Sequence, residues 1–233
     1  MSEAEWAELW GGVAEPAWRA VLETAGPAPG SRVLDVGCGA GHFLAYAITR
    51  GLRAAGADPS ATMVALARTR AADVREAGAE RLPWADASFK LVTSFNAVQF
   101  AGDTDDAIAE MARVTVPGGR IAVVTWAEAA HNDLDAIERA LNDGGSAPDG
   151  DLRTAEGLTG LLADGGLTPV ADGLVAVPWE PADGASLVRG ILLGEEPELD
   201  PVVLAAAAPF RRPDGSYRLL NHFRYAVGER PAL

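Results

Sequence analysis

A glycine-rich segment follows a short apolar run and precedes a helical pattern. Residues 33–41 read VLDVGCGAG, with glycines at 37, 39 and 41. Glycine permits positive φ angles and removes the Cβ that would keep a ligand away, so a loop of this kind suits ligand binding. The dinucleotide fingerprint G-x-G-x-x-G would need its third glycine at position 42, which is His42. The mismatch argues against a nicotinamide enzyme.

Two carboxylates accompany the loop. Asp35 lies two residues before the first glycine, where a carboxylate would repel a diphosphate and favour a cationic group or an ordered water. Asp58 ends the next apolar run, RAAGAD, about twenty residues further on, where a carboxylate can accept hydrogen bonds from the hydroxyls of a ribose. The pair therefore indicates a ligand with a ribose and a positive charge.

Histidine and cysteine side chains are the other candidates for chemistry. A histidine can act as a general base near neutral pH, and His131 is the candidate base because it lies in a polar segment next to Asn132 and Asp133. We expect His42 to be positional and His222 to lie in the last strand. The single cysteine, Cys38, has no partner at informative spacing, so we expect it to fill the loop. No cluster has the spacing of a structural metal site, and no metal is expected.

The elements that must position these residues alternate between strand and helix from residue 32 onward. Such alternation predicts a parallel α/β sheet covered on both faces, with ligands at the carboxyl ends of the strands. Trp126 closes the fifth strand at that edge and is a candidate for substrate binding. A turn is expected at 117–119. The expected strands are 32–36, 53–57, 89–94, 120–125, 174–178 and 217–227, and the expected helices are 42–50, 61–72, 103–114, 134–141, 155–164, 185–193 and 199–209.

The chain of 233 residues is long enough for one domain with a large core. We expect a single domain, divided into a helical lead-in (1–26), a binding core (30–126), a lid or substrate segment (127–150) and a helical cap insertion (182–212). The oligomeric state stays open.

The net charge of −14 would repel a phosphate backbone, and no basic face is evident, so a small-molecule substrate is favoured over nucleic acid. The first residues lack the basic start and apolar core of a signal peptide, and no apolar run is long enough to span a membrane. We therefore expect a cytoplasmic protein with no membrane partner.

Four motifs in order carry a resemblance to a known family. VLDVGCGAG, AGADPS, AERLPWADASF and ARVTVPGGR, spread over residues 30–126, resemble the successive motifs of class I S-adenosylmethionine-dependent methyltransferases, in particular the bacterial small-molecule members. The resemblance implies a Rossmann-like, seven-stranded, mostly parallel sheet with an antiparallel last strand. It also implies S-adenosylmethionine as the cofactor.

The resemblance carries roles onto residues of each motif. Around the methionine part of the cofactor it places Asp35, Gly37, Cys38, Gly39 and Asn96, with Gln99 reaching the same cleft. Asp58 would bind the ribose. Near the adenine it places Pro59, Met63, Ala79 and Glu80. Two positions depart from the pattern: Gly78 stands where many members carry an acid that accepts from the adenine amine, and Lys90 stands where aspartate is usual.

The implied activity is in-line transfer of the cofactor's methyl group to an oxygen, nitrogen or carbon atom of a small metabolite. After the fourth strand the chain reads NAVQ rather than the N-P-P-aromatic signature of enzymes that methylate exocyclic or amide nitrogens, which disfavours nucleobase and glutamine substrates. Two alternatives stay open: a non-methylating, for example cyclising, reaction in natural-product biosynthesis, and a non-catalytic cofactor-binding partner.

Overall fold

The computed structural model describes residues 9–142, 145, 149–193 and 196–232. The first eight residues of the predicted lead-in, and residues 143–144 and 146–148 of the predicted lid, lie outside the described residues. The described lead-in contains α2, Glu15–Ala25, which ends at Gly26 in the left-handed conformation with its N–H donating to the Leu22 carbonyl.

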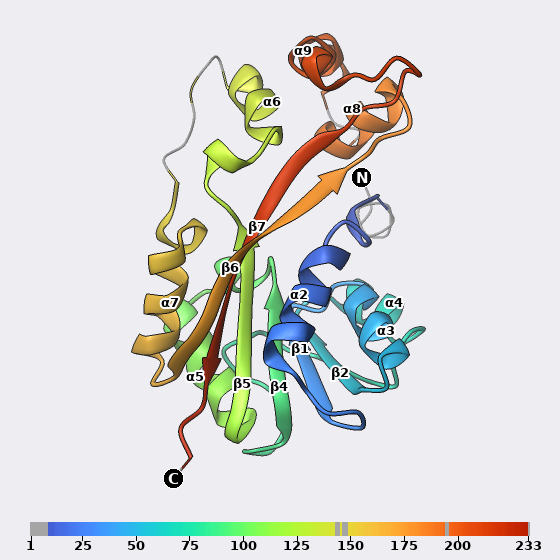
Figure 1. Cartoon of the computed structure of the whole chain (residues 1–233). Coiled ribbons are helices and arrows are strands. Elements are labelled where there is room, and N and C mark those ends of the chain that lie inside the picture. Colours follow the sequence, from blue (N-terminus) through green and yellow to red (C-terminus); the bar gives the residue numbers. More distant parts are fainter. Residues whose placement is uncertain (1–8, 143–144, 146–148, 194–195, 233) are drawn as a thin grey trace.

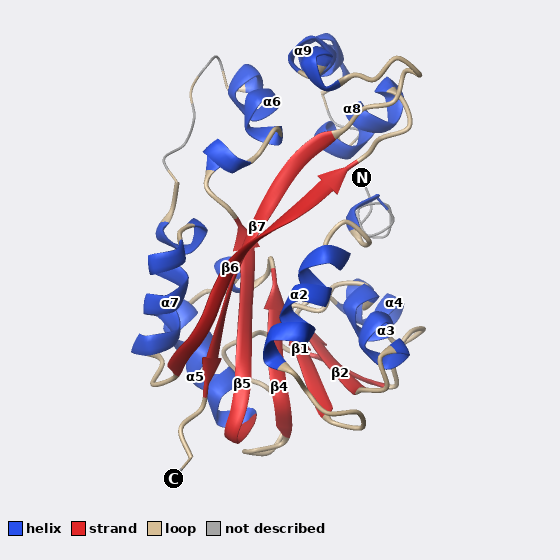
Figure 2. Cartoon of the chain, viewed as in Figure 1, coloured by secondary structure: helices blue, strands red, loops and turns tan. Residues whose placement is uncertain are grey.

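A seven-stranded sheet in the order β3-β2-β1-β4-β5-β7-β6 forms the centre of the described chain. Only β7 runs antiparallel, between β5 and β6. The mostly parallel sheet and its antiparallel last strand are confirmed, and Figure 2 shows the strands fanning out at the centre of the molecule. The strands are β1 Arg32–Val36, β2 Arg53–Asp58, β3 Asp73–Glu76, β4 Phe89–Phe95, β5 Thr115–Trp126, β6 Thr168–Trp179 and β7 Leu219–Glu229.

Helices cover both faces of the sheet (Figure 1). Successive side chains of a strand point to opposite faces, so Val33 packs with α2, α3 and α4 while its neighbour Leu34 packs with α5 and α7. The two faces form separate cores, both closed to solvent. Besides α2, the helices are α3 His42–Thr49, α4 Ala61–Ala67, α5 Thr104–Val114, α6 Leu134–Leu141, α7 Ala155–Asp164, α8 Gly184–Leu192 and α9 Asp200–Ala206.

The structure corrects several predicted boundaries. The turn expected at 117–119 lies inside β5, because Gly118 at φ +65° lets the chain bulge opposite β4 without ending the pairing. Helix α4 ends at Ala67, five residues earlier than predicted. The strand predicted at 174–178 extends over Thr168–Trp179, and β3 was not marked by the residue pattern. The helices at 134–141 and 155–164 are confirmed with their predicted bounds.

The β6–β7 pair extends past the ends of the other strands, and the chain that connects β6 to β7 contains α8 and α9 (Figure 1). These helices and α6 share a third core with the far end of the β6–β7 pair. Its buried members are Leu134, Ile137, Trp179, Leu187, Val203, Ala207, Tyr217 and Leu219. The extension therefore forms a roof above the carboxyl edge of the parallel strands.

Candidate functional site

A cleft of about 700 Å³ lies at the carboxyl edge of β1, β2 and β4. Ligands of parallel α/β sheets bind at this edge, where the loops leave the strands. The cleft brings together the residues that the sequence singled out for the cofactor and acceptor. They are Asp35, Gly37, Cys38, Gly39, Asp58, Pro59, Met63, Ala79, Glu80, Asn96, Gln99 and Trp126.

The glycine loop after β1 has the backbone geometry that requires glycine. Gly37 has φ +75°, and a Cβ built there would lie 2.2 Å from the Cβ of Ala97. Gly39 also has a positive φ, +51°, yet a Cβ there would meet nothing within 4 Å. Packing against Ala97 thus requires glycine at position 37, whereas the space beside Gly39 is open to the cleft. The thiol of Cys38 is buried and faces Gly56 of β2, in agreement with a space-filling role.

The carboxylate of Asp58 holds the loop in place. Its Oδ2 accepts from the Gly39 N–H at 2.8 Å, and its Oδ1 accepts from the Ser60 N–H at 2.9 Å. The side chain is only 7% exposed but lines the cleft. These contacts orient the Asp58 carboxylate toward the loop, and each carboxylate oxygen can accept more than one hydrogen bond.

Asp35 is the most perturbed acid of the cleft. Burial raises its pKa to about 8, the nearby charge of Asp58 adds to the rise, and a hydrogen bond from the Thr93 hydroxyl opposes it. That hydroxyl donates to Oδ1 at 2.8 Å. A carboxyl group with this pKa is largely protonated at neutral pH, and a cation placed beside it would favour its ionised form.

The end of β4 presents polar atoms to the cleft. The Ser94 hydroxyl and the Asn96 Oδ1 are buried and have no hydrogen-bond partner among the described residues. Asn96 adopts φ +51°, a left-handed conformation that asparagine tolerates better than most residues. Buried polar atoms that lack partners are costly, so these two atoms point to a polar ligand in the cleft.

The Glu80 carboxylate lies next to Gly78, the position where many members of the similar family carry an acid. A Cβ at Gly78 would lie 2.9 Å from Glu80 Oε2, so the Glu80 carboxylate occupies the space that a larger residue would need. Glu80 Oε1 accepts from the Gly102 N–H at 2.6 Å, and backbone hydrogen bonds, the first from its own amide, lower the Glu80 pKa. An ionised carboxylate thus lies at this end of the cleft. The unusual Lys90 donates to the Gly118 carbonyl, a structural role.

Aromatic rings form the opposite end of the cleft. Trp126 lies between Phe223, at a centroid distance of 4.8 Å, and Trp10, at 6.3 Å. Trp10 also stacks on Trp179 at 4.5 Å, and its indole N–H donates to the Gly190 carbonyl in α8. The lead-in is thereby tied to the roof. Sequence reasoning identified Trp126 but missed Phe223, which reaches the cleft from β7, almost a hundred residues from Trp126.

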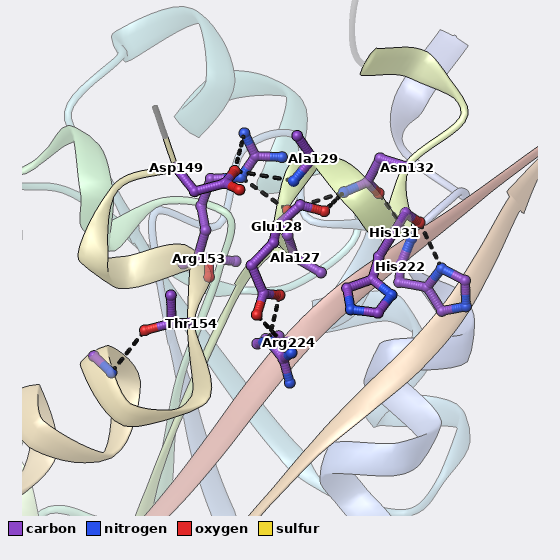
Figure 3. A network of polar contacts seen from close by, with 12 residues as sticks. Ala127, Glu128, Ala129, His131, Asn132, Asp149, Arg153, Thr154, His222 and Arg224 are labelled. Carbon is purple, nitrogen blue, oxygen red and sulfur yellow. Dashed lines mark hydrogen bonds and ion pairs between the residues drawn. The ribbon is translucent and has the colours of Figure 1, made fainter. Parts of the chain in front are cut away.

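His131 lies outside the cleft. It is exposed on a short 3₁₀ helix, Ala129–His131, and does not line either of the two cavities described here. Its carbonyl contacts His222 Nδ1 at 2.7 Å, and the rings lie edge to face (Figure 3). Glu128 and Arg224 form a two-point ion pair next to them, at 2.6 and 2.7 Å. The geometry supports a structural network here, and a role of His131 as base stays a prediction.

A second cavity of about 250 Å³ adjoins the aromatic end of the cleft. The two cavities have Gln99 and Trp126 in common. Its remaining walls come from β5, α6 and the segment before α7. They are Thr125, Asn132, Leu134, Asp135, Glu138, Leu152 and Arg153.

The sheet order and the cleft at its carboxyl edge define a Rossmann-like α/β domain. Residues 34–123 match the family model described as a methyltransferase domain. A malonyl-(acyl-carrier protein) O-methyltransferase of Pectobacterium atrosepticum is 36% identical over 142 residues, 60% of this chain and 53% of that protein. The chain thus spans about half the length of the curated relatives it matches.

Solved structures share the fold across most of the chain. The YcgJ protein of Bacillus subtilis superposes with a TM-score of 0.64 at 18% identity, covering 93% of this chain and 99% of that one. The (4+2)-cyclase SpnF superposes with a TM-score of 0.62 at 19% identity, covering 93% and 81%. In its ordered motifs, its matched domain and its fold, the chain is similar to class I S-adenosylmethionine-dependent methyltransferases.

The described residues contain neither a membrane-spanning helix nor a cluster suited to a metal ion. None of the described helices is long and apolar enough to cross a membrane. Within the same residues, no group of three or more histidine, cysteine, aspartate or glutamate side chains is arranged to hold a metal ion.

Proposed function

We propose that the chain is a methyltransferase that uses S-adenosylmethionine and acts on a small-molecule acceptor. The observation that carries the proposal is that one cleft contains the glycine loop, the two carboxylates and an aromatic end. Its volume, about 700 Å³, is within the range of sites that hold a cofactor and a small molecule together. The net charge of −14 supports a small acceptor over a nucleic acid.

The residues of the cleft fit the cofactor. The open space beside Gly39 admits a ligand close to the backbone, and the unpartnered oxygens of Ser94 and Asn96 offer polar contacts. Both carboxylates line the cleft; we expect Asp58 to accept the ribose hydroxyls, and a positive charge beside Asp35 would favour its ionised form. When bound, the cofactor supplies a methyl group on a positively charged sulfur that is already a good leaving group.

The protein's remaining task is orientation. Holding two reactants in line can contribute about 7–11 kcal/mol to a bimolecular reaction, and a base is needed only if the acceptor atom arrives protonated. Trp126 and Phe223 provide a rigid apolar wall against which an acceptor can lie. The aromatic end therefore suits an acceptor with a flat or apolar body.

Calorimetric titration with S-adenosylmethionine and S-adenosylhomocysteine tests the premise, and failure of both to bind would contradict the proposal. Incubation with methyl-labelled cofactor and a panel of phenols, amines and polyketide-like acceptors then tests the activity. Label in a product supports methyl transfer. A new product without label would replace it with a cyclising reaction, and binding without turnover across the panel would favour a cofactor-binding partner.

A further inference from the structure

The cavity of about 250 Å³ behind Trp126, which we call the side chamber, adjoins the cofactor cleft and shares the wall residues Gln99 and Trp126 with it. We propose that the side chamber binds a protonated amine of the acceptor, while the acceptor's apolar body lies against Trp126 and Phe223. The inference rests on the proposed function, because it names the class of acceptor that the same site would take.

Several donors in the chamber walls already have partners. The Thr125 hydroxyl donates to the Leu152 carbonyl at 2.5 Å. The Asn132 amide donates to the carbonyls of Ala127 and Glu128, both at 2.9 Å. Arg153 donates to the Ala127 carbonyl at 2.8 Å and forms an ion pair with Asp149 at 3.1 Å.

The acceptors that remain favour a ligand with N–H groups. Gln99 Oε1 is buried at the junction of the two cavities and has no partner among the described residues. The Glu138 carboxylate lines the chamber, and no described residue donates a hydrogen bond to it. A ligand that donates several hydrogen bonds matches these walls, whereas a ligand that only accepts would leave them unsatisfied.

The charges of the chamber point to a cation. Asp135 is almost fully buried and pairs at 2.8 Å with Arg139, whose side chain is half exposed and extends away to solvent. Glu138 is exposed as a residue, yet partial burial of its carboxyl raises its pKa; the charge of Arg153 lowers this pKa and that of Asp135 adds a smaller rise. An ammonium group beside Glu138 would offset that cost, because an opposite charge favours the ionised carboxylate.

The wall that carries these groups is held rigidly. Asn132 Oδ1 accepts from the His222 N–H at 2.9 Å, which ties the start of α6 to β7. The Leu134 N–H donates to Asn221 Oδ1 at 3.1 Å. On the other side, Asp149 Oδ1 accepts from the Ala129 N–H at 2.9 Å (Figure 3). A preformed chamber of this kind reduces the ordering cost of binding.

The test uses three probes of one shape: tryptamine, indole-3-propionate and 3-ethylindole, which carry a cation, an anion and no charge. Each is titrated calorimetrically into the protein, with and without saturating S-adenosylhomocysteine. We expect tryptamine to bind at least about tenfold more tightly than the other two, since hydrogen bonds between charged groups are stronger than those between neutral ones. Glu138→Gln should abolish most of that preference, and Glu23→Gln, an exposed charge-matched control on α2, should keep it.

Equal binding of the three probes, or a Glu138→Gln protein that keeps the preference, would overturn the proposal. Tightest binding of indole-3-propionate would also overturn it and assign the chamber to a carboxylate held by Arg153. Failure of S-adenosylhomocysteine to bind would instead contradict the proposed function. In that case, the titration of the free protein still decides whether the chamber selects a cation.

Discussion

Replacing Asp35 by asparagine should stabilise the free protein at neutral pH. The carboxyl is 2% exposed, and burial, more than any other cause, raises its pKa from 3.8 to about 8. Between these values the folded protein keeps a proton that the unfolded chain has lost. The stability that Asp35 contributes is therefore complete below pH 3.8 and declines as the pH rises, until it is lost above pH 8.

The size of the effect follows from the two pKa values. Each pH unit between the two pKa values lowers the free energy of unfolding by about 1.4 kcal/mol. Because pH 7 lies about three units above the ordinary pKa, ionisation of Asp35 in the unfolded chain makes the wild-type protein less stable at pH 7 than at low pH by on the order of 4 kcal/mol. Asparagine has no such dependence, and its Oδ1 can still accept the hydrogen bond from Thr93. The variant should gain up to that amount at pH 7 and little near pH 4.

Urea unfolding followed by circular dichroism at several values between pH 4 and pH 8 measures this difference directly. The stability difference between variant and wild type should grow by up to about 1.4 kcal/mol for each pH unit. Asp172→Asn, at an exposed position in β6, serves as the control and should show no such trend. A difference that stays constant over this range would refute the assignment of a buried, protonated Asp35.

The remaining predictions concern the ligand and the loop. Cofactor binding at pH 7 should release up to one proton as Asp35 ionises beside the positive charge, measured by calorimetry in buffers of different ionisation enthalpy; no release would remove that pairing. Asp58→Ala should weaken cofactor affinity by more than about 1 kcal/mol, and unchanged affinity would end its role at the ribose. Gly37→Ala should lower the free energy of unfolding by more than about 1 kcal/mol, because its Cβ would collide with Ala97 at a positive φ; an unchanged urea midpoint would contradict this. A loss of turnover of tenfold or more at saturating substrate in His131→Ala would support its predicted role as base, and unaltered turnover, the outcome that its place outside the cleft favours, would end that role.

The sequence by itself determined the architecture and the part of the site that is local in the chain. The short apolar run that contains Val33 and Leu34 predicts a buried strand, and these two side chains do pack into opposite cores. The glycines at 37 and 39 predict a loop with positive φ angles, as the structure has it. These inferences hold because backbone preferences and side-chain periodicity act over a few residues. For the same reason the loop, Asp35 and Asp58 could be placed together before the fold was known, and they do line one cleft.

Tertiary structure alone decided the acceptor end of the site. Phe223 and Trp126 meet because β7 pairs antiparallel with β5, and Trp10 joins them because the lead-in packs under α8. His131 does not line the cleft, and its carbonyl contacts the ring of His222, a residue of β7 far away in the chain. The side chamber exists because the fold brings the end of β5, α6 and the segment before α7 to one cavity. Contacts between residues so distant in the chain depend on strand order and roof packing, which local sequence patterns do not encode.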